Sequence, residues 1–221
     1  MKRDHILLFS GGIDSYVAWH YLNKPATVYF DVKSRYSKKE VEVVKKLIPS
    51  TIIDTSLDLS KREEGEKAYI PFRNLLLALQ AAHYSDNIII AGLMDDMVSD
   101  KNEEAFLRFS DIMSYLEGRS ITVTSPFWKM TKEDVAKWYK INIGDDRILD
   151  TISCYSPDPD TTYCGECPSC FRKWVALRSI GYDLKFYNKN LMNDYYQNAL
   201  KGKYVISRNE AIVREIDAYC Y

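Results

Sequence analysis

The turn Ser10-Gly11-Gly12-Ile13-Asp14-Ser15 places two glycines, two hydroxyl side chains and a carboxylate between an apolar run and a helix-like segment. A strand, such a turn and a helix together direct several backbone N–H groups and the positive end of the helix dipole at one point. Glycine permits the sharp turn and the close approach of an anion, and Ser10 and Ser15 add hydroxyl donors. The pattern therefore favours a phosphate site over a simple strand–turn–helix corner.

The carboxylate of Asp14 has no direct role in holding a phosphate, because the two negative charges repel. Three roles suit it: orienting the loop, accepting a backbone N–H at the start of the helix, or reaching a magnesium ion. The turn matches neither GxxxxGK[ST] nor GxGxxG, so it is neither a Walker loop nor a dinucleotide fingerprint.

Four cysteines in the last third of the chain have the spacing of a metal site. Cys154, Cys164, Cys167 and Cys170 follow the pattern C-x9-C-x2-C-x2-C. Such thiolates can enclose a tetrahedral Zn²⁺ with Zn–S bonds of about 2.3 Å, and four of them leave no open position, so we expect one structural zinc per chain. An iron–sulfur cluster is the main alternative, although the ferredoxin spacings differ. Cys220 is expected to take no part.

Two further polar pairs stand at the ends of predicted elements. Arg73 and Asn74 open an apolar helix at residues 72–84, where an arginine opposes the helix dipole unless an anion is bound nearby. Asp95 and Asp96 follow the apolar strand at residues 87–92. Open α/β sheets bind their ligands at the carboxyl ends of such strands, so both pairs are candidate site residues.

Apolar periodicity alternates between strand and helix along the first two thirds of the chain. The pattern predicts a doubly wound, mainly parallel α/β sheet, and the apolar residues Phe106, Phe109, Ile112, Met113 and Leu116 are expected on the inner face of one helix. We expect an α/β domain at residues 1–150 and a zinc-binding, helical C-terminal segment at residues 151–221. The five expected strands cover residues 5–9, 27–32, 51–55, 87–92 and 120–124.

Composition narrows the class of protein. The 221 residues suffice for one sizeable core, with 46% hydrophobic and 28% charged residues. The net charge of −1 gives no general attraction to nucleic acid, so direct nucleic-acid binding is not expected. No apolar stretch approaches the roughly 18 residues that span a bilayer, and four clustered thiols suit a reducing compartment, so we expect a cytoplasmic protein without membrane contact.

Several of these pieces together resemble a known family. The SGGIDS turn is similar to the PP-loop of the ATP-pyrophosphatase superfamily, whose members split ATP into AMP and pyrophosphate. With Arg73-Asn74, Ser153-Cys154-Tyr155 and the CGECPSCFRK segment at residues 164–173, the chain resembles the 7-cyano-7-deazaguanine synthase (QueC) family. The resemblance extends over most of the chain, and it implies an adenine nucleotide alpha hydrolase-like fold.

The resemblance also implies a reaction. That family activates the carboxylate of 7-carboxy-7-deazaguanine as an adenylate, lets ammonia displace AMP to give an amide, and dehydrates the amide to a nitrile with a second ATP. The implied partners are this acid, ammonia and Mg-ATP, and a homodimer is one option for the assembly. The implied residues are Phe9, Ser10, Gly11, Gly12, Ile13, Asp14 and Ser15 for ATP, Asp14, Ser15 and Arg73 for catalysis, Arg73, Asn74, Asp95 and Asp96 for substrate, and the four cysteines for metal.

The sequence departs from the family pattern in two segments that are expected to lie near the substrate. Family members carry a YPDCRxxF segment after the fourth strand, whereas residues 98–106 here contain neither the cysteine nor the arginine. The YGQ-type turn after the second strand is replaced by Ser34-Arg35-Tyr36-Ser37. The departures point either to a divergent member with an altered deazaguanine product or to a relative that attaches such a base to another acceptor.

Two other functions are alternatives. A PP-loop enzyme that modifies tRNA, of the thiolase or lysidine synthetase type, predicts a basic RNA-binding face and, for thiolation, a reactive cysteine pair near ATP. The balanced charge and the absence of any cysteine before Cys154 count against it. The other alternative is a non-catalytic, zinc-organised module that binds a nucleotide.

Overall fold

A five-stranded parallel sheet forms the centre of the computed structural model, which describes residues 3–65, 69–156, 158 and 160–220. The strand order is β3-β2-β1-β4-β5, and all four pairings are parallel. In register, Leu7 of the central strand lies between Thr27 and Ile89. The strands are β1 (Ile6–Leu8), β2 (Ala26–Phe30), β3 (Ile52–Asp54), β4 (Asn87–Ile90) and β5 (Thr122–Thr124).

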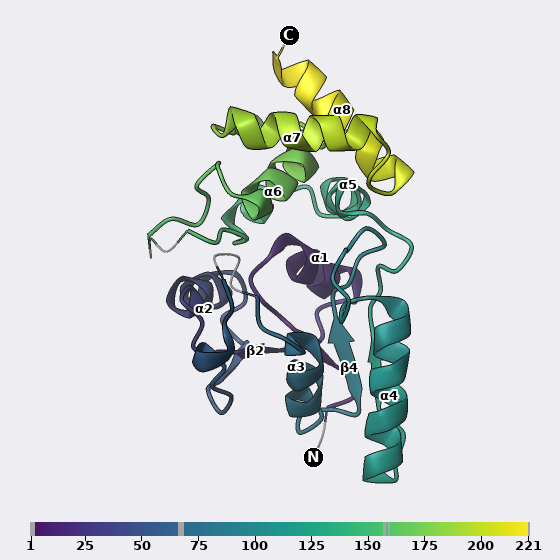
Figure 1. The fold of residues 1–221 in the computed structure, drawn as a ribbon. Coiled ribbons are helices and arrows are strands. Elements are labelled where there is room, and N and C mark those ends of the chain that lie inside the picture. Colours follow the sequence, from purple (N-terminus) through teal and green to yellow (C-terminus); the bar gives the residue numbers. More distant parts are fainter. Residues whose placement is uncertain (1–2, 66–68, 157, 159, 221) are drawn as a thin grey trace.

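Helices cover both faces of this sheet (Figure 1). One face packs against α1 (Ile13–Tyr21), α2 (Ser37–Leu47) and α5 (Lys132–Asn142), and the other against α3 (Arg73–Ala81) and α4 (Glu103–Glu117). The doubly wound, parallel α/β fold expected from the sequence is therefore confirmed. Because the chain reverses its winding direction between β1 and β4, the crevice for ligands opens at the carboxyl ends of these two strands.

The outer helices are less buried than their apolar sequences predict. In α4, Phe106 and Met113 are buried, but Ile112 and Leu116 are 47% and 69% exposed, so the expectation for these two was wrong. The reason is that α4 lies over β5, a three-residue strand at the edge of the sheet, so the far side of the helix has no neighbouring strand to cover it. Leu79 of α3 is likewise exposed.

Three helices follow the sheet and pack at one end of the molecule (Figure 1). They are α6 (Pro168–Arg178), α7 (Lys189–Leu200) and α8 (Ile206–Cys220), and they share an apolar cluster built around the fully buried Trp174. The indole Nε1 of Trp174 donates to the carbonyl of Leu184 at 2.9 Å. Leu177 of α6 packs into the core of the sheet, so α6 joins the two groups of elements.

Two short 3₁₀ helices, Ser60–Arg62 and Asp146–Asp150, complete the elements. Among the helices in the described part of the chain, none has the length and apolarity needed to cross a membrane.

Candidate nucleotide and metal site

A cavity of about 1370 Å³ opens at the carboxyl ends of β1 and β4 and extends to α7. Most of the residues expected from the sequence border it, while Gly11, Asp95 and Cys170 are not among its lining residues. Ligand pockets usually measure about 300–1,000 Å³, so this cavity is large enough for more than one small substrate. The expected residues that border it are Phe9, Ser10, Gly12, Ile13, Asp14, Ser15, Arg73, Asn74, Asp96, Cys154, Cys164 and Cys167.

The loop after β1 is held in shape by its own hydroxyl groups. The Ser15 Oγ accepts from the Ser10 backbone N–H at 3.2 Å and lies 3.2 Å from the Gly12 carbonyl, to which it donates. Gly12 is the N-cap of α1, and within the described residues no side chain caps this helix. The first-turn N–H groups therefore border the cavity without a side-chain acceptor, which suits an anion.

Gly11 is required for both its conformation and its size. Its φ is +73°, a left-handed value that side chains rarely adopt. A Cβ at this position would lie 3.1 Å from Val43 and 3.2 Å from Ile152. The side chains packed beneath the loop thus favour glycine at this position.

Asp14 forms an ion pair with Lys132, the first residue of α5. Lys132 is only 7% exposed, and it borders the same cavity. Thr131 caps α5 in a capping box with Asp134, and the sequence analysis gave Lys132 no role. A signal was present, because a lysine in the first turn opposes the helix dipole just as Arg73 does in α3.

Asp96 lies between two cations. Its Oδ2 is 2.9 Å from the Nζ of Lys101, and its Oδ1 accepts from the Nη1 of Arg172 at 3.1 Å. Burial by itself would raise the pKa of Asp96, but the Lys101 and Arg172 charges outweigh it and hold this pKa well below its usual value. Burial opposes the charge of Lys101 as well, and the neighbouring Asp96 and Asp14 raise its pKa above the ordinary one. Asp96 is therefore a carboxylate at neutral pH.

Asp95 is buried behind the cavity wall and is 3% exposed. Its Oδ2 accepts from the Nη2 of Arg172 at 3.0 Å, and its carbonyl oxygen accepts from the Nη1 of Arg208 at 3.2 Å. Asp95 thus links Arg172 to α8. The sequence analysis named Arg172 only as part of the segment at residues 164–173.

Arg73 and Asn74 both border the cavity from the start of α3. The Nε of Arg73 is buried and has no hydrogen-bond partner among the described residues, as expected of a guanidinium that awaits an anion. Asn74 is fixed instead by Asp100, whose carboxylate accepts from the Asn74 backbone N–H at 3.0 Å and from its Nδ2 at 2.9 Å. Asp100 therefore caps α3 from the segment in which the sequence departs from the family.

Glu40 is a further acidic group on the cavity that sequence reasoning missed. The hydroxyl of Tyr29 donates to its Oε2 at 2.6 Å. Burial raises the pKa of Glu40, and the nearby charge of Arg73 and the Tyr29 hydrogen bond act in the opposite direction. Tyr29 lies on β2 and Arg73 on α3, whereas Glu40 lies on α2. No local sequence pattern therefore identifies Glu40 as a site residue.

The four cysteines meet beside the cavity. The Sγ atoms of Cys154, Cys164, Cys167 and Cys170 all lie within 4.8 Å of one another, and all four thiols are free of disulfides. The Sγ atoms of Cys164 and Cys170 are 3.8 Å apart. A tetrahedron with bonds of about 2.3 Å has an edge of about 3.8 Å, so the cluster fits one metal ion.

The backbone around the cysteines supports this arrangement. Gly165 has a φ of +69°, and a Cβ there would lie 2.8 Å from the ring of Tyr187, so only glycine fits the first turn. Cys167 is the N-cap of α6, and the Cys170 N–H donates to its Sγ at 3.4 Å. The N-terminal end of α6 and this hydrogen bond favour the thiolate, which a metal ligand requires.

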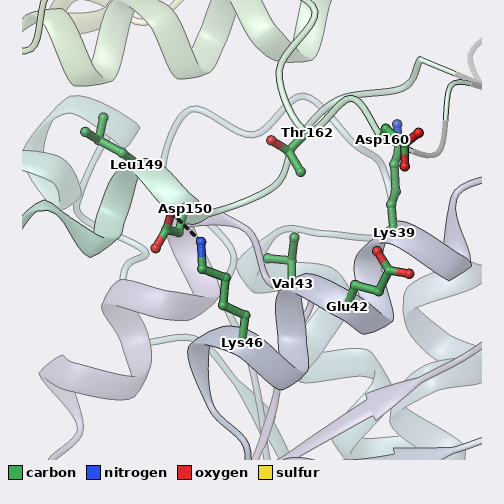
Figure 2. Close-up of a pocket in the computed structure, with 8 residues that line it drawn as sticks. All are labelled: Lys39, Glu42, Val43, Lys46, Leu149, Asp150, Asp160 and Thr162. Atoms are coloured by element: carbon green, nitrogen blue, oxygen red, sulfur yellow. Dashed lines mark hydrogen bonds and ion pairs between the residues drawn. The ribbon is translucent and has the colours of Figure 1, made fainter.

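A second, smaller hollow of about 300 Å³ lies along α2 (Figure 2). Lys46 reaches Asp150 across it at 2.8 Å, and the Nζ of Lys39 donates to the carbonyls of Ser156 and Thr161 at 2.5 and 3.1 Å. These contacts tie α2 to the segment that leads into the cysteines, so the lysines of this hollow have a structural part.

Comparison with known proteins places these features in context. A sequence model described as "Queuosine biosynthesis protein QueC" matches residues 39–181. Relatives named 7-cyano-7-deazaguanine synthase occur in Methanococcus aeolicus (24% identical, 80% of this chain and 96% of the relative), Rickettsia conorii (24%, 80% and 95%) and Pyrococcus furiosus (27%, 85% and 98%). The tRNA-modifying and non-catalytic alternatives are not favoured by these matches.

Proposed function

Because this chain belongs to the QueC family, we propose that it is an ATP-dependent ligase that converts 7-carboxy-7-deazaguanine and ammonia to 7-cyano-7-deazaguanine. One observation carries the proposal. The loop at residues 9–15, here called the phosphate loop, borders the same cavity as the cations Arg73 and Lys132 and the cysteine cluster. An adenylating ligase needs such a site, because two substrates must meet at the α-phosphorus of ATP.

The first step is adenylation. Residues Phe9 to Ser15 hold the phosphates through the N-terminal N–H groups of α1 and the serine hydroxyls. A carboxylate oxygen of the acid attacks the α-phosphorus, and the bond to pyrophosphate breaks. Lys132 transfers from Asp14 to the phosphates, and Asp14 then becomes available to the magnesium ion of Mg-ATP. The Lys132 charge offsets the negative charge that develops on the leaving pyrophosphate.

The second step is amide formation. Ammonia attacks the acyl carbon, loses a proton, and AMP leaves. A second ATP then adenylates the amide oxygen with release of pyrophosphate. That oxygen leaves as part of AMP while the amide nitrogen loses two protons, which yields the nitrile. The chain's part in both halves is to hold the acyl group still and to exclude water, since hydrolysis of the adenylate would waste ATP.

Arg73 supplies the charge that orients the acid, because its guanidinium borders the cavity with an unpartnered Nε. Asn74 and Asp96 line the same space. We assign Asp95 an indirect part in substrate binding, through the Arg172 that it anchors.

The metal is proposed to be zinc. Four thiols whose Sγ atoms lie within 4.8 Å of one another, one pair of them 3.8 Å apart, suit a single tetrahedral ion better than an iron–sulfur cluster, and a full shell of sulfurs makes the ion structural. Free thiols and the use of ATP also suit the cytoplasm. In this proposal residues 1–150 form the ATP-binding domain and residues 151–221 the metal-binding segment packed on it. A homodimer stays a prediction.

The test is to incubate the protein with Mg-ATP, ammonium and 7-carboxy-7-deazaguanine. We expect mass spectrometry to detect the nitrile, with AMP and pyrophosphate formed only when the acid is present. Release of AMP without any amide or nitrile would indicate another acceptor. Absence of acid-dependent AMP formation would contradict the proposal.

A further inference from the structure

One face of α7 borders the cavity through Leu191, Asp194, Tyr195 and Asn198. These residues are spaced i, i+3, i+4 and i+7, so they share one side of the helix. The family model matches residues 39–181, and α7 begins at Lys189, outside this range. The cavity therefore has a wall that the family match does not describe.

This wall is held in a fixed position against α6. The ring of Tyr195 stacks on Phe171 with centroids 4.2 Å apart and an interplanar angle of 15°. Phe171 lies in the chain between the metal-ligand candidate Cys170 and the cavity residue Arg172. On the other side, the Tyr196 hydroxyl donates to Asp217 of α8 at 2.8 Å. The face is thus positioned relative to the rest of the cavity.

Two polar side chains of this face are available to a ligand. Within the described part of the chain, neither the Asp194 carboxylate nor the Asn198 amide has a hydrogen-bond or ion-pair partner, whereas Asp14, Asp96 and Glu40 each have at least one. Asp194 is exposed at the cavity and Asn198 is half-buried. As residues i and i+4, they present an acceptor pair and an amide side by side.

We propose that Asp194 and Asn198 recognise the polar edge of the deazaguanine ring, an inference that rests on the proposed function. That edge carries two adjacent N–H donors, at N1 and the 2-amino group, beside the O6 acceptor. A carboxylate can accept from both donors and an amide NH₂ can donate to O6, so the two side chains match the edge in number and order. Tyr195 lies between them in the chain and borders the same cavity.

The assignment predicts which bases the enzyme rejects. An acid with a hypoxanthine-type ring lacks the 2-amino donor and leaves one bond to Asp194 unmade. A site built to bond a group discriminates strongly against an analogue that lacks it. Asp194 and Asn198 are therefore specificity residues for the ring, and the phosphate chemistry proceeds without them.

The experiment compares 7-carboxy-7-deazaguanine with its hypoxanthine-type analogue by the rate of AMP formation. We expect the wild type to prefer the guanine-type acid at least about 10-fold in kcat/KM. Asp194→Asn should raise the KM for this acid about 10-fold or more, reduce the preference towards unity, and leave the KM for ATP unchanged. Asn198→Ala should raise the KM for both acids, since both carry O6.

Glu210→Gln is the matched control for the loss of one carboxylate, since Glu210 is exposed on α8 and away from the cavity. It should keep wild-type constants. An active wild type together with an Asp194→Asn variant of unchanged KM and unchanged preference would overturn the inference alone. A wild type that forms no acid-dependent AMP would overturn the proposed function and the inference with it.

Discussion

The ammonium group of Lys132 pairs with the carboxylate of Asp14 at the edge of the phosphate loop, across 118 residues of sequence. The pair joins the first turn of α1 to the first turn of α5. Both side chains border the cavity, so in the proposed reaction a triphosphate would meet a cation that is already in place and would only have to exchange its partner. The roles of Asp14 and Lys132 can therefore be tested by separate substitutions.

Asp14→Ala should abolish ATP turnover, with acid-dependent AMP formation reduced by at least about 100-fold, because the loop loses its carboxylate and Lys132 loses the partner that orients it. The fold should remain, which circular dichroism and the thermal melting temperature would report. Normal turnover in a folded variant would refute the assignment of the loop.

Lys132→Met should leave the fold and slow adenylation by at least about 100-fold, because the methionine has a similar length and no charge to stabilise the leaving pyrophosphate. The measurement is single-turnover formation of AMP, with the enzyme in excess over ATP and the acid saturating. Lys129→Met is the control, since Lys129 is exposed and precedes the same helix. Equal rates in both variants would exclude a role for Lys132 in the step.

Gly11→Ala should destabilise the protein more than Gly118→Ala does. Both glycines have a positive φ, +73° and +63°, but a Cβ at Gly118 meets nothing within 4 Å, whereas one at Gly11 presses on Val43 and Ile152. The left-handed backbone conformation lowers the free energy of unfolding of both alanine variants by about 1 kcal/mol or more. The steric contact of the new Cβ lowers it further only at Gly11. Urea unfolding of the two variants would measure the difference. A Gly11→Ala variant as stable as Gly118→Ala, with normal ATP binding, would contradict the packing argument.

Cys167→Ser should release the metal and unfold the C-terminal segment, because a structural ion contributes its binding energy to folding. Elemental analysis of the wild type should find about one zinc per chain. Cys220→Ser provides the control, as Cys220 is exposed and lies outside the cluster. Detection of iron in the wild type would overturn the choice of zinc.

Asp96→Asn should change the pH dependence of stability. In the folded protein the pKa of Asp96 is held below its unfolded value by Lys101 and Arg172, against the effect of burial. Its contribution to stability is therefore complete above the unfolded pKa of about 4 and is lost as the pH falls through the lower, folded value. We expect the variant to lose roughly 3 kcal/mol at pH 7, since two cations remain without their shared partner. The difference from wild type should shrink below about pH 4. A difference that is constant from pH 7 to pH 2 would contradict this role of the pair.

Local chemistry made part of the site predictable. The turn at residues 10–15 is a short stretch whose glycine and serine positions determine its own backbone, and it joins a strand to a helix as predicted. The cysteine spacing likewise predicted a cluster that the structure brings together. The residues that neutralise one another across the cavity were not predictable, because Lys132, Lys101 and Arg172 find their partners on other elements.

Alternation of apolar residues by itself determined the five parallel strands and the helices between them, since burial on a sheet or a helix face requires a repeating pattern. The sequence also determined the glycine- and serine-containing turn after β1 and the spacing of the four thiols. Only the tertiary structure decided that Asp95 lies behind the cavity wall and Asp96 on it, that Ile112 and Leu116 stay exposed, and that α7 completes the cavity. These outcomes depend on which elements become neighbours, and that is set by packing between segments distant in sequence.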